Sequence, residues 1–552
     1  MEVVITTIIC YLLLMIAIGV YFSKKNNDVS DFYLGGRKLG AIVTAMSAEA
    51  SDMSSYLLMG LPGLAYLCGC AEVTWTAIGL SLGTYFNWLF VAKRLRVYSS
   101  KCKAITIPDF FSRRYHDERN IIMGISAIII LIFFIPYTAS GFSACGKLFE
   151  QLFNWEYHVA MIVSAIIIVL YTSIGGFLAA STTDLIQSIV MSLALIVVVI
   201  YGVSSAGGFG KVFDNAKGLK GYLTLNESHN ADDNTSSPFG FISIISTMAW
   251  GLGYFGMPHI LLRFMAIGNK DKVKVSRRIA TVWVVLSMFI AIFIGIIANA
   301  LSANGTIEKL TTSSESETAI IKIAFVMNEK NILAAIFAGL IFAGILACTM
   351  STADSQLLAA SSSASENLLK GMFKLKISEK VSMIVARVVL IVIAVLAVII
   401  AWDKNSSIFK VVSFAWAGFG ATFGPVMLLA LFWKRSNKWG SLAGLIVGGI
   451  VVFVWHFFIS KIGGVFQIYE LLPAFILALI SDVLVSLVTK EPDKIIIKEF
   501  EDYKKELNIK ENSEEELNEK DYTKELDKNE ISSELEKKDY PKELKEKDIT
   551  EE

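Results

Sequence analysis

Residues 47–63 read SAEASDMSSYLLMGLPG, and this stretch decides how the chain must fold. Apolar sequence leads into it from Ala41 and continues from Leu57, as in a helix that crosses a membrane. Its middle nevertheless holds Glu49, Asp52 and four serines. A charged side chain at the centre of a bilayer costs roughly 2.5–3.5 kcal/mol even on the mildest scale. The two carboxylates therefore indicate an unwound segment that faces protein or water and not lipid.

The composition of the whole chain indicates an all-α, polytopic membrane protein. Of 552 residues, 54% are hydrophobic and the mean hydropathy is +0.57, which is too apolar for a soluble protein of this length. About 20 apolar residues suffice to span a bilayer. We identify thirteen such segments, at about 3–22, 41–67, 71–92, 121–145, 157–178, 181–204, 238–261, 279–301, 332–358, 381–402, 407–432, 439–459 and 467–489.

Charge is distributed unevenly, although the formal net charge is zero. Residues 491–552 hold 23 acidic and 13 basic residues, a net charge of −10, so residues 1–490 carry +10. The basic runs KRLRVYSSKCK, KDKVKVSRR and KRSNK fall on alternate loops, and basic loops face the cytoplasm. We therefore expect the N-terminus outside and the C-terminus in the cytoplasm. The sequence predicts a membrane domain at 1–490 and a charged, disordered cytoplasmic tail at 491–552.

Two of the thirteen segments are interrupted. The span at 41–67 holds the polar stretch, and the span at 238–261 holds WGLGYFGMPH, with three glycines and a proline. The two lie five spans apart, and an odd offset turns the second copy upside down in the membrane. Paired interruptions in inverted halves are typical of secondary transporters, whose binding site lies at the midplane. We expect repeats at about 41–204 and 238–432; close helix packing remains the alternative for single glycines.

Five stretches resemble the sodium/solute symporter family, and their order is similar to that of its sodium/proline symporter branch. They read SAEASDMSSYLLMGLPG, GGFLAASTTD, WGLGYFGMPHILLRFMA, MSTADSQLLAASSSASENL and SFAWAGFGATFGPV. The resemblance covers most of residues 1–490 and not the tail. It implies a LeuT-type core of two inverted five-helix repeats, thirteen helices, and Na⁺-coupled uptake of L-proline across the cell membrane by alternating access.

Two alternatives stay open. One is Na⁺-coupled uptake of another small organic solute, because Tyr56 and Met257 depart from residues that are common in the proline branch. The other is a membrane sensor with a transporter-like domain. We find no nucleotide-binding loop and no nucleophile elbow, so neither an ATP-driven pump nor an enzyme is expected, and nothing indicates nucleic-acid binding.

By this resemblance, the principal Na⁺ site is built from the interrupted span at 41–67 and the span at 332–358. Its ligands are the backbone carbonyls of Ala50, Met53 and Cys348 and the hydroxyls of Ser351 and Thr352. The residues themselves are compatible with this, because hard cations prefer oxygen ligands and CTMSTADS places its hydroxyls on one helical face. Hydroxyls that bond only to carbonyls of their own helix are the alternative.

Two more acids form a second candidate cation site. Some members of the family bind a second sodium ion near the positions of Asp184 and Asp354, and Ser355 would add a hydroxyl. The alternative for Asp184 is an acid at a helix end that faces the cytoplasm.

Three further charged residues match positions at or near the interruption. Asp52 is expected to support Na⁺ affinity and coupling without direct ligation. Glu49 is expected to face a vestibule or to be protonated. Arg37, in LGGRKLG, is expected either to act at a cytoplasmic gate or to set the topology.

The substrate site follows from the chemistry of proline, which is a zwitterion with a small apolar ring. A carboxylate suits the free N–H groups of an unwound helix, and a cationic nitrogen suits carbonyls or an aromatic face. An aromatic wall suits the ring. The candidate substrate residues are Ser54, Tyr56, Tyr137, Trp250, Tyr254 and Pro258. The alternative for the aromatic residues is helix packing or a membrane-interface belt.

Overall fold

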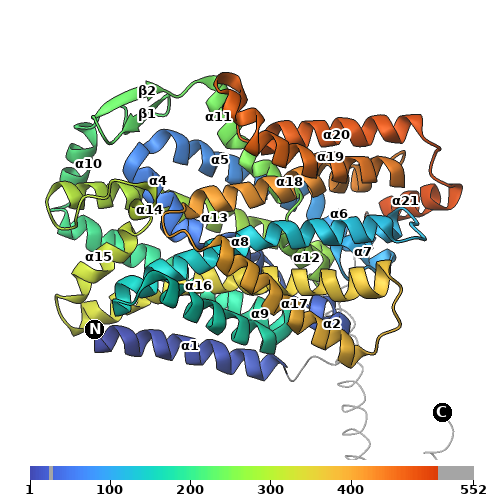
Figure 1. The fold of residues 1–552 in the computed structure, drawn as a ribbon, viewed down its shortest axis with the longest axis horizontal. Coiled ribbons are helices and arrows are strands. Elements are labelled where there is room, and N and C mark those ends of the chain that lie inside the picture. Colours follow the sequence, from blue (N-terminus) through green and yellow to red (C-terminus); the bar gives the residue numbers. More distant parts are fainter. Residues whose placement is uncertain (24–28, 508–552) are drawn as a thin grey trace, which may run out of the picture. The chain divides into compact units, whose positions relative to one another are not determined.

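The structure, a computed structural model, describes residues 1–23 and 29–507. Figure 1 traces them as a set of helices with one small hairpin. Within these ranges, nine helices are long and apolar enough to cross a membrane. The four other expected spans, at 41–67, 71–92, 157–178 and 238–261, coincide with shorter or broken helices. The all-α membrane architecture is confirmed, and the count of thirteen spans stays a prediction.

The helices of the first half are α1 (Glu2–Ser23), α2 (Val29–Leu34), α3 (Ala41–Asp52), α4 (Leu61–Cys68), α5 (Cys70–Phe86), α6 (Lys93–Lys101), α7 (Ile107–Arg114), α8 (Ile121–Phe153), α9 (Tyr157–Ser205) and α10 (Phe209–Lys217). The helices of the second half are α11 (Phe241–Met248), α12 (Pro258–Ala266), α13 (Val273–Ala303), α14 (Ser313–Ser316), α15 (Ala319–Asn328), α16 (Ile332–Ser362), α17 (Glu379–Ile400), α18 (Ile408–Phe432), α19 (Lys438–Phe457), α20 (Leu471–Val488) and α21 (Lys494–Glu506). Short 3-10 or π-helical segments cover Gly35–Arg37, Tyr56–Gly60, Asn87–Ala92, Ala249–Phe255, Lys270–Lys272, Ser363–Met372, Ile459–Ile462 and Gly464–Gln467.

Both interruptions that the sequence predicts are present. Helix α3 ends at Asp52, Met53 has non-helical backbone angles (φ −75°, ψ 69°), and the chain resumes through a π-helical segment into α4. Helix α11 passes into a 3-10 segment and then into the extended backbone of Met257 (ψ 108°). Pro258 opens α12, where its missing N–H costs nothing because that group has no partner within a helix.

The packing around α3 brings distant parts of the chain to its broken end. Helix α3 contacts α9, α12, α13 and α16, and α16 also packs along α8 and α9. Helix α9 is continuous in sequence but bends at Gly176, whose positive φ of 73° divides it where the sequence predicts two spans. The end of α3 therefore faces side chains from α9, α12 and α16.

A β-hairpin stands outside the helical pattern and was not predicted. Strands β1 (Glu227–Asn230) and β2 (Thr235–Pro238) pair antiparallel. The loop before them holds the junction of α4 and α5, because the N–H of Cys70 donates to the carbonyl of Tyr222 at 2.7 Å.

Helix α21 extends the folded part beyond the boundary at 490 that the sequence predicts. The compact unit covers Met1–Leu507, and residues 508–552 lie outside the described residues. Phe500 and Tyr503 of α21 are buried. The ring of Tyr503 stacks on Tyr98 of α6 at 4.4 Å, and its hydroxyl donates to the carbonyl of Leu431 at 2.7 Å. The apolar face of this charged helix packs on the protein, and ion pairs along the helix add to the contact.

Candidate ion and substrate site

The break after α3 releases a backbone carbonyl. In an unbroken helix the N–H of Ser54 would donate to the carbonyl of Ala50, but here it donates to the carbonyl of Asp52 at 2.8 Å. The carbonyl of Ala50 instead accepts a hydrogen bond from the hydroxyl of Ser351 at 2.8 Å. An oxygen from the broken helix therefore meets an oxygen from α16, although 301 residues separate them in the sequence.

All five predicted Na⁺ ligands are buried beside this contact or next to it in sequence. Ser351 also donates to the carbonyl of Cys348 at 3.2 Å, so Ala50, Cys348 and Ser351 lie together. Met53 is buried at the break, and its sulfur accepts a hydrogen bond from Tyr56 at 3.4 Å. The hydroxyl oxygen of Thr352 is buried and has no hydrogen-bond partner among residues 1–23 and 29–507. Carbonyl and hydroxyl oxygens of this kind suit a hard monovalent cation.

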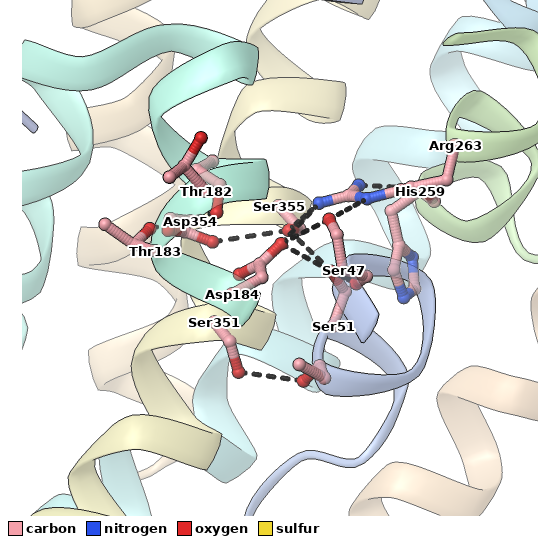
Figure 2. Close-up of polar contacts among 12 residues, drawn as sticks. Ser47, Ser51, Thr182, Thr183, Asp184, His259, Arg263, Ser351, Asp354 and Ser355 are labelled. Carbon is pink, nitrogen blue, oxygen red and sulfur yellow. Dashed lines mark hydrogen bonds and ion pairs between the residues drawn. The ribbon is translucent and has the colours of Figure 1, made fainter. Parts of the chain in front are cut away.

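A second polar cluster lies one helical turn away, around an ion pair that the sequence analysis did not foresee (Figure 2). The guanidinium of Arg263, on α12, lies 3.1 Å from the carboxylate of Asp184, on α9, and both side chains are almost fully buried. Ser47 and Ser51 of α3 donate to the same carboxylate oxygen of Asp184, at 2.6 and 3.2 Å. Asp184 is therefore a buried partner of an arginine. It is not an exposed acid at a helix end, which was the alternative for it.

Helix α16 closes this cluster. The hydroxyl of Ser355 lies 3.0 Å from that of Ser51, accepts a hydrogen bond from Arg263, and donates to Asp354 at 3.3 Å. The other carboxylate oxygen of Asp354 has no partner within the described part of the chain. The cluster thus joins α3, α9, α12 and α16. Arg263 could have been found in the sequence, because an arginine between apolar residues in HILLRFM is rare unless it is paired.

Asp52 belongs to the aromatic side of the break and not to this cluster. One of its carboxylate oxygens accepts a hydrogen bond from the hydroxyl of Tyr254, and the other is buried without a partner in the described structure. Its backbone carbonyl accepts from the hydroxyl of Tyr137 at 3.2 Å. Trp416 donates in turn to Tyr137 at 3.1 Å. Two of the predicted substrate residues therefore meet at the last residue of α3.

The remaining candidate substrate residues lie at the edge of the same region. The rings of Tyr56 and Trp250 stack at 5.8 Å, and the indole N–H of Trp250 has no partner within the two described ranges. Trp250 also lines a cavity of about 590 Å³ together with Phe409 and Tyr469. Ser54 is buried at the break. The cavity therefore reaches one member of the stacked pair, Trp250. Trp416, Phe409 and Tyr469 were not predicted, since an apolar span gives no sign of which aromatic residue faces the site.

Glu49 does not face the cavity, contrary to one of the two expectations for it. Its side chain is buried, and one carboxylate oxygen accepts hydrogen bonds from Thr84 at 3.1 Å and from the indole of Trp88 at 2.9 Å. Glu49 therefore ties α3 to α5 and to the π-helical segment that follows it.

Arg37 joins the start of α3 to the end of α12. Its guanidinium donates to the carbonyl of Met265 at 2.6 Å and to the hydroxyl and carbonyl of Ser99, each at 3.1 Å. Burial, and then the neighbouring charge of Arg96, lower the pKa of Arg37 to about 10. These contacts tie the segment before α3 to the ends of α6 and α12, and the gate role of Arg37 stays a prediction.

The sequence of the chain is similar to that of known membrane transporters. A model of the sodium:solute symporter family matches residues 32–448. A sodium/proline symporter of Haemophilus influenzae is 42% identical over 500 residues, which are 90% of this chain and 96% of that protein. A high-affinity proline transporter of Bacillus subtilis is 40% identical over 493 residues, which are 89% and 99% of the two chains.

The fold also matches a solved structure. A Na⁺-coupled sialic acid symporter in a substrate-bound, outward-open state superimposes with a TM-score of 0.72 at 18% identity, over 89% of this chain and 98% of that one. This likeness shows the shared LeuT-type fold. The chain therefore belongs to the sodium:solute symporter family, whose members are membrane transporters and not enzymes.

Proposed function

We propose that this protein takes up L-proline together with Na⁺ by alternating access. The observation that carries the proposal is the broken end of α3, where the freed carbonyl of Ala50 meets the hydroxyl of Ser351. We propose proline as the substrate because the relatives at 40% and 42% identity are a proline transporter and a sodium/proline symporter. We propose the cell membrane as its location, with the N-terminus outside and the C-terminus in the cytoplasm, because the basic loops alternate in that sense.

The Na⁺ ion is proposed to bind among the carbonyls of Ala50, Met53 and Cys348 and the hydroxyls of Ser351 and Thr352. The hydroxyl of Ser351 donates a hydrogen bond to the carbonyl of Ala50, and the hydroxyl oxygen of Thr352 has no partner in the described structure. A bound Na⁺ would replace the hydrogen bond between Ser351 and Ala50 and would give the hydroxyl oxygen of Thr352 a partner. Since the site spans the break in α3 and the middle of α16, its occupancy favours the arrangement in which these two elements are close.

L-proline is proposed to bind between the two interruptions, against Tyr56, Tyr137, Trp250 and Tyr254. The free carboxylate oxygen of Asp52 offers an acceptor for the cationic nitrogen. Ser54 and Pro258 complete the pocket at the two breaks. Since Trp250 lines the cavity and stacks on Tyr56, movement of this pair is proposed to admit the substrate.

The polar cluster is proposed to couple the ion to the helices. Asp52, Asp184, Asp354 and Ser355 are the candidates for coupling or for a second Na⁺. Arg263 already supplies a positive charge to Asp184, so a second ion would depend on the unpartnered oxygen of Asp354. The two inverted repeats, at about 41–204 and 238–432, would rock against each other around these contacts.

The first test is uptake of radiolabelled L-proline into proteoliposomes of the purified protein. An inward Na⁺ gradient should drive accumulation above the external concentration, and a sodium ionophore or an equal K⁺ gradient should abolish it. Accumulation of a different solute under the same gradient would replace proline but keep the symporter. Saturable proline binding without any accumulation would favour a sensor.

A further inference from the structure

His259 is a buried side chain that the proposed ion site does not use. It is fully buried in α12, and neither ring nitrogen has a hydrogen-bond partner among residues 1–23 and 29–507. An imidazole carries at least one N–H donor in either neutral tautomer. Buried polar groups are nearly always paired. The backbone of Ser51 lies beside the ring, but neither nitrogen makes a well-formed hydrogen bond within the described residues, so the ring keeps hydrogen-bonding capacity for a ligand.

The ring lies where the second interruption ends. His259 follows Pro258 at the start of α12, and the first hydrogen bond of this helix runs from Leu261 to Met257. The backbone N–H groups of His259 and Ile260 therefore precede the hydrogen-bonded part of the helix. Figure 2 shows the ring turned towards α3 near Ser51. The side chain thus adds a donor to a helix end that already favours negative charge.

The ring also lies beside an aromatic residue of the proposed substrate site. Its centre lies 6.2 Å from the ring of Tyr137 and 5.7 Å from that of Phe134. Tyr137 is the residue that bonds to the carbonyl of Asp52. His259, the second residue of α12, therefore lies near the residue that bonds to the last residue of α3.

Arg263, the cation one turn further along α12, is already engaged. Its Nε donates to Ser47, and one terminal nitrogen contacts Asp184 and Ser355. The other terminal nitrogen donates to the backbone carbonyl of His259. A substrate carboxylate would have to break the buried ion pair to reach this guanidinium, and the imidazole requires no such exchange.

We propose that His259 donates a hydrogen bond to the carboxylate of the transported amino acid. The substrate would then lie across the two breaks, with its carboxylate at the start of α12 and its cationic nitrogen near the free oxygen of Asp52. This assignment rests on the proposed function, because it needs a zwitterionic substrate. It makes His259 a residue that distinguishes an amino acid from an analogue without the negative charge.

The test compares L-proline with L-prolinamide, in which a neutral amide replaces the carboxylate. Dissociation constants are measured by ligand-induced thermal stabilisation of the purified protein in saturating Na⁺. In His259→Phe the dissociation constant for proline is expected to rise by about 10- to 150-fold, which corresponds to one hydrogen bond to a charged group. The constant for prolinamide is expected to change by less than about 3-fold, so the preference for proline over prolinamide falls. His259→Gln keeps a donor and should retain most of that preference.

Two controls separate the outcomes. His456→Phe makes the same chemical change on α19, where the ring is part-exposed and bonds to Glu470, and it should leave the preference unchanged. Na⁺-dependent stabilisation without proline reports that each variant is folded. Equal losses for both ligands in His259→Phe, or equal preference in the Phe and Gln variants, would overturn the assignment. Failure of the wild-type protein to bind proline would instead refute the proposed function.

Discussion

Thr352 offers the sharpest test of the ion site, because its hydroxyl does nothing else in the described structure. The oxygen is buried and has no hydrogen-bond partner among residues 1–23 and 29–507, whereas Ser351, the neighbouring ligand, bonds to two carbonyls. Thr352→Val keeps the shape of the side chain and replaces only the hydroxyl by a methyl group. The substitution therefore removes a proposed Na⁺ ligand without removing a hydrogen bond of the protein.

The size of the effect follows from these contacts. A polar contact to a charged group contributes about 1.5–3 kcal/mol, so the Na⁺ concentration for half-maximal uptake should rise by about 10- to 150-fold. The free energy of unfolding in Na⁺-free buffer should stay the same or increase, since an unpaired buried hydroxyl is removed. At a Na⁺ concentration 100 times the wild-type dissociation constant, the ion stabilises the wild type by about 2.7 kcal/mol. A 100-fold weaker site would leave about 0.4 kcal/mol of this stabilisation.

Two assays measure this prediction independently. Uptake of L-proline as a function of Na⁺ gives the half-saturating concentration, and thermal unfolding in Na⁺ and in K⁺ gives the stabilisation by the ion. Thr352→Ser is the matched control, because it keeps the hydroxyl, and its Na⁺ dependence should lie within about 3-fold of the wild type. A Thr352→Val protein with wild-type Na⁺ dependence would remove this residue from the site and refute the reasoning.

Three other predictions concern contacts described above. Asp184→Asn leaves the guanidinium of Arg263 buried without its counter-charge, and thermal unfolding should show a loss of about 3–5 kcal/mol; an unchanged melting temperature would contradict the buried pair. Tyr503→Phe removes only the hydrogen bond from α21 to the end of α18 and should cost about 1 kcal/mol in the same assay, whereas a loss several times larger would mean that the ring has moved. The backbone N–H of Thr311 lowers the pKa of Glu315. This carboxylate therefore stabilises the fold above its unfolded pKa of about 4.3, and the contribution disappears as pH falls through the lower folded value. Glu315→Gln should make the melting temperature less sensitive to acidification over that range, and a pH profile identical to that of the wild type would count against this.

The sequence predicts the interruptions of the membrane helices well, because polar residues in an apolar run have few explanations. The run from Ser47 to Ser55 and the glycines before Pro258 both mark breaks that the structure contains. The face of α16 that carries Ser351 could also be predicted, since helical periodicity alone fixes which hydroxyls lie together. In these cases the signal is local.

The contacts between helices could not be predicted in the same way. Arg263 and Asp184 are 79 residues apart, and no periodicity indicates that α9 places one beside the other. The end of the folded part was predicted at 490 because charged residues dominate the composition beyond that point. An average over composition hides the few apolar residues that form one face of α21. Phe500 and Tyr503 become informative only once Tyr98 is known to lie opposite them.

The position of α21 also has a consequence for how the protein is made. The residues that receive it, Tyr98 and Leu431, are synthesised long before Tyr503. The aromatic surface around Tyr98 therefore stays uncovered while the membrane helices are inserted one after another. Helix α21 can cover that surface only late in biogenesis. A chain that ends before Lys494 would lack α21, and proteases would meet the inserted protein with this aromatic surface exposed.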